Sequence, residues 1–246
     1  MLMTSLLNQA NNKDNREHFL NRIAKAAGRP RHALKDHPFK PLNTLPDDLL
    51  ADKGPEELLN IAIKNSESVN AQVVLKPASQ LTDFLTTYAK QENVSHLLLP
   101  NNTPEEWEKY GLTEWSKNPG VENVAVWSDK LSRQENEENA NEADLAVGMG
   151  DYLIASTGTV TVVNRPAQGR GFDYLPTRLL LIVSKSGLVK STREAVNKYN
   201  EQTANGLSTS TFNFISGPSN SGDIEMELVV GVHGPVECTY LVVEDR

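Results

Sequence analysis

Cysteine is nearly absent from this sequence, since Cys238 is the only one among 246 residues. A single thiol excludes an intrachain disulfide. It also excludes a cysteine-based metal site or a standard thiolate-ligated iron–sulfur cluster built by this chain alone. Cys238 lies in a hydrophobic stretch with the pattern of a strand, so we expect a buried and unreactive thiol.

Basic residues and long hydrophobic runs are also scarce. The chain has 24 Lys and Arg against 32 Asp and Glu, a formal net charge of -8. This balance argues against general binding to nucleic acids or anionic membranes, because phosphate groups are recognised by basic surfaces. No apolar run approaches the roughly 18 residues that a membrane-spanning helix needs, and the first residues show neither a basic leader nor a small-residue cleavage site. We therefore expect a cytoplasmic protein without a membrane span.

Several short motifs with known chemistry are missing as well. The sequence contains neither the phosphate-binding loop G-x-x-x-x-G-K-[ST] nor the dinucleotide fingerprint G-x-G-x-x-G, and Gly148-Met149-Gly150 lacks the third glycine. The motifs H-E-x-x-H and G-x-S-x-G do not occur either. Nucleotide binding of these types is therefore unsupported.

What the chain does contain is an alternation of short apolar strands and amphipathic helices. Strand-like runs occupy residues 71–75, 96–99, 124–127, 143–149, 160–163, 178–183 and 239–243, and helical spacing of apolar residues marks 55–63, 81–88 and 191–198. Residues 129–142 are acidic and rich in asparagine, which fits a surface helix or a loop. The alternation of strand and helix predicts an α/β fold.

The N-terminal part has a different character. Residues 14–17 resemble a helix-capping sequence, and an apolar helical face follows until Gly28 and Pro30 end the element. Residues 29–46 contain four prolines and little periodicity, which predicts an extended arm that either docks a partner or lies on its own domain. The predicted organisation is a helix and proline-rich arm over residues 1–46, followed by one α/β domain over residues 47–246.

The chain closes with a stretch, residues 214–240, that is rich in turn formers, hydroxyl side chains and acids. Asp223 and Glu225 stand two residues apart, so on one strand both carboxylates would face the same side and share one environment. Such a pair suits a general base or the binding of a hard cation, and a solvated strand edge is the alternative. His233 lies between glycines and could face a cleft, although an isolated histidine is more often structural.

Three further features could hold an anion. Thr157-Gly158-Thr159 places a glycine between two hydroxyls at the start of a strand, where backbone amides and hydroxyls can bind a negatively charged oxygen. A β-bulge with surface threonines is the alternative. Gly217-Pro218-Ser219 is turn chemistry first, and Arg178 could clamp a carboxylate or phosphate unless it forms a surface salt bridge.

Four blocks of the sequence, in this order and spacing, resemble the lactate utilisation protein C family, the LUD domain proteins. They are Ala155-Ser156-Thr157-Gly158-Thr159, Leu175-Pro176, residues 216–225 and residues 231–235. The resemblance extends from residue 47 to residue 246, and the N-terminal helix and arm also look like the family. It implies a three-layer αβα fold with a mostly parallel sheet, similar to the NagB/RpiA/CoA-transferase group.

The resemblance also implies a function. It indicates a component of a cytoplasmic L-lactate utilisation system that supports oxidation of L-lactate to pyruvate. Iron–sulfur clusters are then expected on partner subunits, and neither a cofactor nor a metal is expected in this chain. Asp223, Glu225 and His233 would be catalytic, with His233 or a carboxylate as base. A small carboxylate or acyl ligand would be held by Thr157, Gly158, Thr159, Gly217, Ser219, Asn220, Ser221 and Arg178.

Two alternatives stay open. The first is an independent enzyme on a CoA-transferase-like or sugar-phosphate isomerase-like fold, with Asp223 or Glu225 as nucleophile or base. Ser156 stands where relatives often have a glutamate, which weakens an autonomous acyl-transfer role. The second is a non-catalytic assembly subunit that docks its partners through residues 29–46.

Overall fold

The computed structural model of this chain describes residues 12–31, 40, 42–164, 168–209, 211–224, 227–231 and 233–246, with the backbone alone for 221–224 and 227–230. The chain divides into two compact units, Met1–Thr44 and Leu45–Arg246. The predicted domain boundary after Pro46 stays a prediction. Residues 32–39 and 41 of the predicted arm lie outside the described residues.

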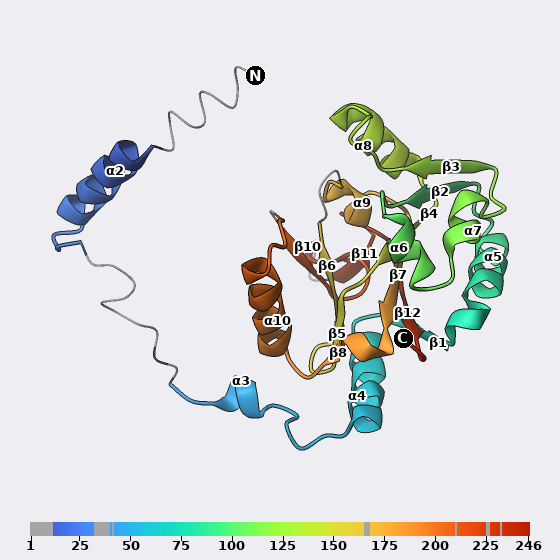
Figure 1. Ribbon diagram of the computed structural model, residues 1–246, viewed down its shortest axis with the longest axis horizontal. Helices are drawn as coiled ribbons and strands as arrows, with labels where there is room; N and C mark the ends of the chain where they lie inside the picture. Colours follow the sequence, from blue (N-terminus) through green and yellow to red (C-terminus); the bar gives the residue numbers. More distant parts are fainter. Residues whose placement is uncertain are drawn as a thin grey trace. The chain divides into compact units, whose positions relative to one another are not determined.

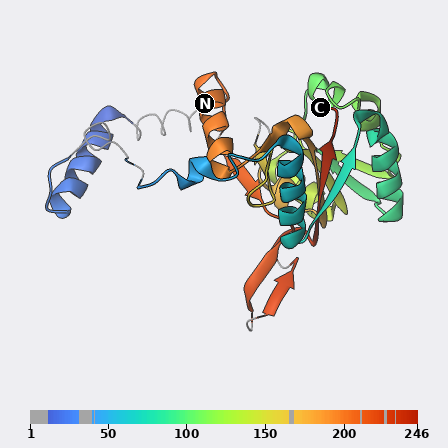
Figure 2. The same ribbon diagram turned by 90° about the horizontal axis from the view of Figure 1, so that it is seen from below.

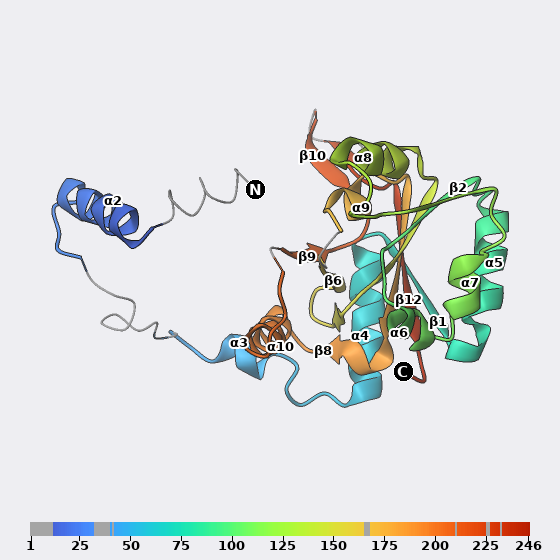
Figure 3. The ribbon, with the colours of Figure 1, turned by 45° about the horizontal axis from the view of Figure 1, so that its top comes forward.

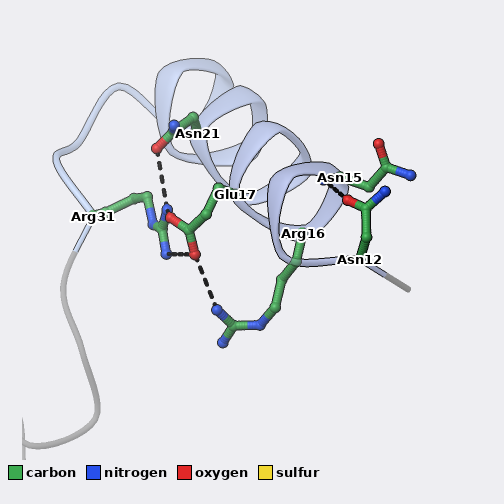
Figure 4. A network of polar contacts seen from close by, with 6 residues as sticks. All are labelled: Asn12, Asn15, Arg16, Glu17, Asn21 and Arg31. Atoms are coloured by element: carbon green, nitrogen blue, oxygen red, sulfur yellow. Dashed lines mark hydrogen bonds and ion pairs between the residues drawn. The ribbon is translucent and has the colours of Figure 1, made fainter. Parts of the chain in front are cut away.

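The first unit contains helix α2 (Lys13–Ala26), as the sequence predicts. The helix begins after Asn12, whose side-chain oxygen accepts a hydrogen bond of 2.8 Å from the backbone N–H of Asn15. After the helix the chain turns at Gly28, and Arg31 then reaches back to pair with the carboxylate of Glu17 (Figure 4). The ion pair joins the first residues of the arm to the helix.

The second unit is built on a six-stranded parallel sheet. In sheet order its strands are β1 (Ala71–Lys76), β12 (Glu237–Val243), β7 (Arg178–Ser184), β4 (Leu145–Met149), β2 (His96–Leu99) and β3 (Asn123–Val126). The chain leaves β2 toward β3 on one side and leaves β4 toward β7 on the other, so the strand order reverses between β2 and β4. In open α/β sheets, such a reversal opens a crevice at the carboxyl ends of the strands.

Side chains of the central strands alternate between two hydrophobic cores. In β7, Leu179, Leu181 and Val183 belong to one core, and Leu180 and Ile182 belong to the other. This is the period of two of a strand whose two faces are both covered. Because both faces are apolar, the strand appears in the sequence as a continuous hydrophobic run.

Helices cover both faces of the sheet, which confirms the predicted three-layer architecture. Figure 3 shows α5 and α7 on one side of the sheet and α4 on the other. The helices of this unit are α3 (Leu45–Asp48), α4 (Pro55–Ser68), α5 (Leu81–Gln91), α6 (Pro104–Glu108), α7 (Thr113–Lys117), α8 (Arg133–Glu142), α9 (Gly171–Tyr174) and α10 (Thr192–Ala204), with 3₁₀ turns η2 (Ala78–Gln80) and η3 (Lys185–Gly187). Among the described helices, none combines the length and the apolar character needed to cross a membrane.

Helix α8 resolves the choice that the sequence left open for residues 129–142. Ser132 and Glu135 form a capping box: the N–H of Ser132 donates to the Glu135 carboxylate (2.7 Å), and the N–H of Glu135 donates to the Ser132 hydroxyl (3.2 Å). These reciprocal bonds satisfy two of the amide groups that a helix start leaves without partners. The segment is therefore helical from Arg133 despite its polar composition.

In the described part of the chain, two smaller sheets lie outside the parallel sheet (Figure 1). A four-stranded sheet has the order β8 (Leu188–Val189), β5 (Tyr152–Ile154), β6 (Thr159–Val163) and β9 (Phe212–Ile215). The other sheet consists of β10 (Asn220–Ile224) and β11 (Glu227–Val230), which form an antiparallel hairpin that projects from the rest of the unit (Figure 2). The sequence pattern around Asp223 predicts one strand. In the structure, Ile224 instead pairs with Glu227 across a hairpin. Alternation with a period of two is common to a long strand and to the two arms of a tight hairpin, so it does not locate the turn.

Tyr240, in the middle of β12, joins the parallel sheet to the four-stranded sheet. Its side chain is 0% exposed. The hydroxyl donates to the carbonyl oxygen of Ile215 at the end of β9 (2.6 Å) and accepts a hydrogen bond from the N–H of Gly217 (2.8 Å). Burial raises the pKa of this hydroxyl well above its ordinary value, so it keeps the proton that it donates.

We expect Tyr240→Phe to lower the free energy of unfolding by roughly 1–3 kcal/mol, because it leaves a carbonyl and an N–H without their partner. Urea unfolding followed by circular dichroism measures the change. Tyr174→Phe is the matched control, since Tyr174 is 41% exposed and its hydroxyl has no hydrogen-bond partner among the described residues. Equal losses in the two variants would contradict the role given to the Tyr240 hydroxyl.

Candidate functional site

Two glycines of the predicted signature meet at the C-terminal end of α4. Gly158 has φ +62, and a Cβ atom there would lie 2.2 Å from the backbone nitrogen of Ser66. Gly217 has φ +74, and a Cβ atom there would lie 1.9 Å from the carbonyl oxygen of Val69. Only glycine fits at either position. Helix α4 is therefore part of the site's frame, which the sequence pattern does not indicate.

One of the two predicted threonines, Thr159, binds a serine of the other signature half. The hydroxyl of Thr157 donates to that of Thr159 (2.8 Å), and Thr159 shares a hydrogen bond of 2.7 Å with the hydroxyl of Ser216. Thr159 is buried and Thr157 is exposed. The structure thus brings residues 155–159 and 216–225 together through the last residue of the first block and the first residue of the second.

A cavity of about 240 Å³ lies beside Ser216, and we name it the loop cavity. Its lining comes from the loop between β9 and β10, from the turn before β12, and from α9 with the start of β7. The lining residues are 214–219, His233, Gly234, Pro235, Asp173, Tyr174 and Leu179. Three predicted residues, Gly217, Ser219 and His233, therefore share one cavity. The N–H of Ser219 donates to the carbonyl oxygen of Pro235 (2.9 Å), which joins the two loops.

Asp173 is the chemically most distinctive lining residue, and the sequence reasoning missed it. Its side chain is 1% exposed. One carboxyl oxygen, Oδ2, accepts a hydrogen bond from the side-chain amide of Asn213 (2.9 Å), whereas Oδ1 is buried without a partner among the described residues. Burial raises the pKa of Asp173 from 3.8 to about 7, and the bond from Asn213 offsets only part of this effect.

The orientation of Asp173 is set by a short amide chain. The amide nitrogen of Asn213 donates to Asp173 and also to the side-chain oxygen of Asn164 (2.7 Å). A sequence signal for Asp173 did exist: it is an acid between the aromatic residues Phe172 and Tyr174, directly before the Leu175-Pro176 block. An acid in such apolar surroundings is a candidate for a perturbed pKa and hence for function.

The remaining predicted residues lie apart from the loop cavity or are not described. Arg178 begins β7, and its Nε lies 2.9 Å from a carboxylate oxygen of Glu237 and 3.4 Å from one of Glu92. The side-chain amide of Asn220 donates to the carbonyl oxygen of Pro218 (3.0 Å). The side chains of Ser221 and Asp223, and the whole of Glu225, lie outside the described residues. The ligand or catalytic roles of these residues stay predictions.

Cys238 is buried in β12, as the sequence predicts. Burial raises the pKa of its thiol to about 12, so the thiol stays protonated at neutral pH and is a poor nucleophile or metal ligand. Within the part of the chain that the structure describes, no group of three or more His, Cys, Asp and Glu side chains is placed to hold a metal ion.

A second cavity, of about 270 Å³, lies at the carboxyl ends of β4 and β7, next to the reversal of strand order. We name it the switch-point cavity. Its lining residues are Glu106, Lys109, Tyr110, 149–152, Ser184, Ser186, Gly187 and Gln202, and no predicted site residue is among them. The ammonium group of Lys109 lies 4.9 Å from the centre of the Tyr110 ring and has no carboxylate partner in the described part of the chain.

We expect Gly217→Ala to destabilise the protein more than Gly111→Ala. Both positions have positive φ, which costs an alanine roughly 1–2 kcal/mol. Gly111 has nothing within 4 Å of an added methyl group, whereas the methyl at Gly217 would overlap the carbonyl of Val69. Overlap of this kind adds roughly 1–3 kcal/mol. Urea unfolding of both variants measures the difference, and equal losses would contradict the close approach of this loop to α4.

Comparison with known proteins agrees with these features. The LUD domain family model matches residues 59–243. Lactate utilization protein C of Halalkalibacterium halodurans is 32% identical over 236 residues, which cover 94% of this chain and 98% of that protein. The protein of the same name from Geobacillus kaustophilus is 34% identical over 239 residues, which cover 94% of this chain and 97% of that protein.

A solved structure has the same fold. The crystal structure of a DUF162 family protein from Deinococcus radiodurans matches with a TM-score of 0.55 at 19% sequence identity, covering 78% of this chain and 99% of that one. The family match over most of the second unit and the similarity to curated relatives along their whole length agree with the four sequence blocks. This chain therefore belongs to the lactate utilization protein C family of LUD domain proteins.

Proposed function

We propose that this protein is a component of a cytoplasmic L-lactate utilisation system, where it supports the oxidation of L-lactate to pyruvate together with partner proteins that carry iron–sulfur clusters. The observation that carries the proposal is the 32% and 34% identity, over 94% of this chain, to proteins named lactate utilization protein C. Composition is in keeping with it, since a net charge of -8 does not suit binding to nucleic acids.

The chemistry of the single thiol supports placing the electron carriers on partners. Oxidation of a hydroxy acid to a keto acid needs an acceptor for two electrons. A standard iron–sulfur cluster is held by four thiolates, and this chain has one cysteine, buried and protonated. A role in binding, positioning or assembly beside such partners fits this chain better than electron transfer by its own side chains.

The loop cavity is the site that we assign to a small carboxylate or acyl ligand. Its volume of about 240 Å³ is below the roughly 300–1,000 Å³ of sites for drug-sized molecules, and it suits a small metabolite. Phe214 and Leu179 offer apolar surface for a methyl group, and the exposed imidazole of His233 is available to a polar group. His233 is the candidate base, because a base must lie within hydrogen-bond reach of the ligand.

Growth on L-lactate tests this proposal. We expect that deleting the gene abolishes growth on L-lactate as sole carbon source but not on glucose, and that the wild-type gene restores growth. His233→Gln is expected to restore growth poorly because the ligand loses its base. His96→Gln is the matched control: His96 is also exposed, begins β2 and lines neither cavity.

The outcomes of this experiment separate the hypotheses. Normal growth of the deletion strain on L-lactate would contradict the function itself. If the gene is required but His233→Gln and a variant at Ser219 both restore full growth, the protein acts by assembling its partners and not through the loop cavity.

The switch-point cavity favours a second candidate function, that of an independent enzyme. The carboxyl end of a parallel sheet, next to a reversal of strand order, is where ligands bind in open α/β folds. Lys109 supplies a cation there without a carboxylate partner among the described residues. A CoA ester or a sugar phosphate, the substrates of enzymes with similar folds, would bring a phosphate group that a lysine can bind.

Thermal unfolding in the presence of CoA esters and sugar phosphates tests the second candidate. A ligand at 100 times its Kd stabilises a protein by about 2.7 kcal/mol, which raises Tm by several degrees in a domain of this size. We expect any such shift to disappear in Lys109→Met. It should persist in Lys117→Met, because Lys117 is exposed and paired with Glu114. No shift with either class of compound would remove the case for this candidate.

A further inference from the structure

Asp173 combines three properties that rarely occur together without a function. It lines the loop cavity, its side chain is 1% exposed, and its Oδ1 atom is buried without a hydrogen-bond partner among the described residues. Leaving a buried polar atom unpaired is costly, and such atoms in folded proteins usually await a ligand, a water molecule or a proton. The other oxygen is held by Asn213 at 2.9 Å, so the free one has a defined position.

The charged and ionisable groups around Asp173 give its carboxylate form little support. Asp151, directly before β5, is a second acid and disfavours the ionised form of Asp173. Cys238, in β12, is a neutral thiol whose pKa is raised by burial and, to a smaller extent, by the charge of Asp173. Within the same segment, burial raises the pKa of the Tyr174 hydroxyl, which is therefore neutral. The positive charge of Arg170 lowers the pKa of Tyr174 in part. The loop before β12 contributes His233 to the same cavity. No cation forms an ion pair with Asp173 in the described part of the chain.

We propose that the loop cavity binds the carboxylate group of its ligand with Asp173 in the neutral acid form, so that ligand binding is coupled to protonation of Asp173. The Oδ1–H of the neutral acid donates to an oxygen of the bound carboxylate, and Asn213 continues to hold Oδ2. An ionised Asp173 repels the same ligand. The inference rests on the proposed function only for the class of ligand, a small carboxylate.

The coupling predicts how affinity changes with pH. Because the pKa of Asp173 is about 7, its neutral form predominates below that pH and declines above it. A ligand carboxylate, with a pKa near 4, stays ionised over this whole range. Above pH 7 each pH unit removes about nine-tenths of the binding-competent protein, so Kd rises about tenfold per unit. A cationic ligand would show the opposite trend.

Calorimetric titration of the full chain with sodium L-lactate tests the inference. The titrations are made at about pH 6 and about pH 8.5, in two buffers with different ionisation enthalpies. For the wild type we expect Kd to rise roughly thirtyfold between the two pH values, with uptake of about one proton per L-lactate at the higher pH. For Asp173→Asn, which imitates the neutral acid, we expect the same Kd at both pH values and no proton uptake by this residue.

His233→Gln is the control for the imidazole that also lines the loop cavity. Whatever its affinity, this variant should keep the wild-type slope of Kd with pH. If the slope is lost in His233→Gln and kept in Asp173→Asn, the coupling belongs to His233 and the inference is overturned. Binding of L-lactate with one Kd at all pH values overturns it as well but leaves the carboxylate site standing. Absence of L-lactate binding at pH 6 overturns both the site and the inference, while growth on L-lactate still tests the function separately.

A measurement without ligand tests the premise that the pKa of Asp173 is raised in the folded protein. Because the folded-state pKa of Asp173 is raised from 3.8 to about 7, its contribution to stability is fully present below pH 3.8 and is lost as pH rises through 7. Asp173→Asn lacks this loss. As the pH rises from about 5 to about 8, the free energy of unfolding of the wild type should therefore fall relative to that of the variant. Urea unfolding at both pH values measures this change. A difference that does not change with pH overturns the premise, and a normal unfolding transition shows that the variant is folded.

Discussion

The arrangement of the second unit depends on the buried hydroxyl of Tyr240. The hydroxyl sits in the core of the parallel sheet but binds Ile215 and Gly217, which belong to the end of β9 and the loop after it. A polar group in such apolar surroundings must keep its partners, since water cannot replace them. The hydroxyl therefore holds the loop at one position on the sheet, and at that position Gly217 lies directly on the carbonyl of Val69.

This anchoring explains why so many signature residues are small or carry hydroxyls. Gly158 and Gly217 let two turns approach the backbone of α4, and Thr159 and Ser216 bind each other across the gap between the turns. Gly158 and Thr159 build the frame of the site and do not line the loop cavity, whereas Ser216 and Gly217 both belong to the frame and line the cavity. The interior of the loop cavity is left to groups of different chemistry, above all Asp173 and His233.

The two cavities lie at opposite ends of the parallel strands. The loop cavity is near the amino ends of β7 and β12, and it contains a buried acid that forms no ion pair within the described part of the chain. The switch-point cavity is at the carboxyl ends of β4 and β7, and it contains a lysine without a carboxylate partner among the described residues. The second follows from the topology of any open parallel sheet. The loop cavity, in contrast, exists because the loop after β9 and the turn before β12 are added to that sheet.

The sequence by itself determined the α/β class, the N-terminal helix and the family, because these depend on patterns within short segments: strand and helix alternation, a helix cap, and four blocks in order. It also indicated that Ser219 and His233 belong to one site. Only the tertiary structure decided that the alternation near Asp223 forms a hairpin, that Gly217 lies against the end of α4, and that Asp173 is a buried acid with one oxygen unpartnered among the described residues. Burial, close approach and a shifted pKa are produced by all the elements that pack around a residue, and residues such as Asn213 and Asp151 are far from Asp173 in the chain. No local pattern contains that information.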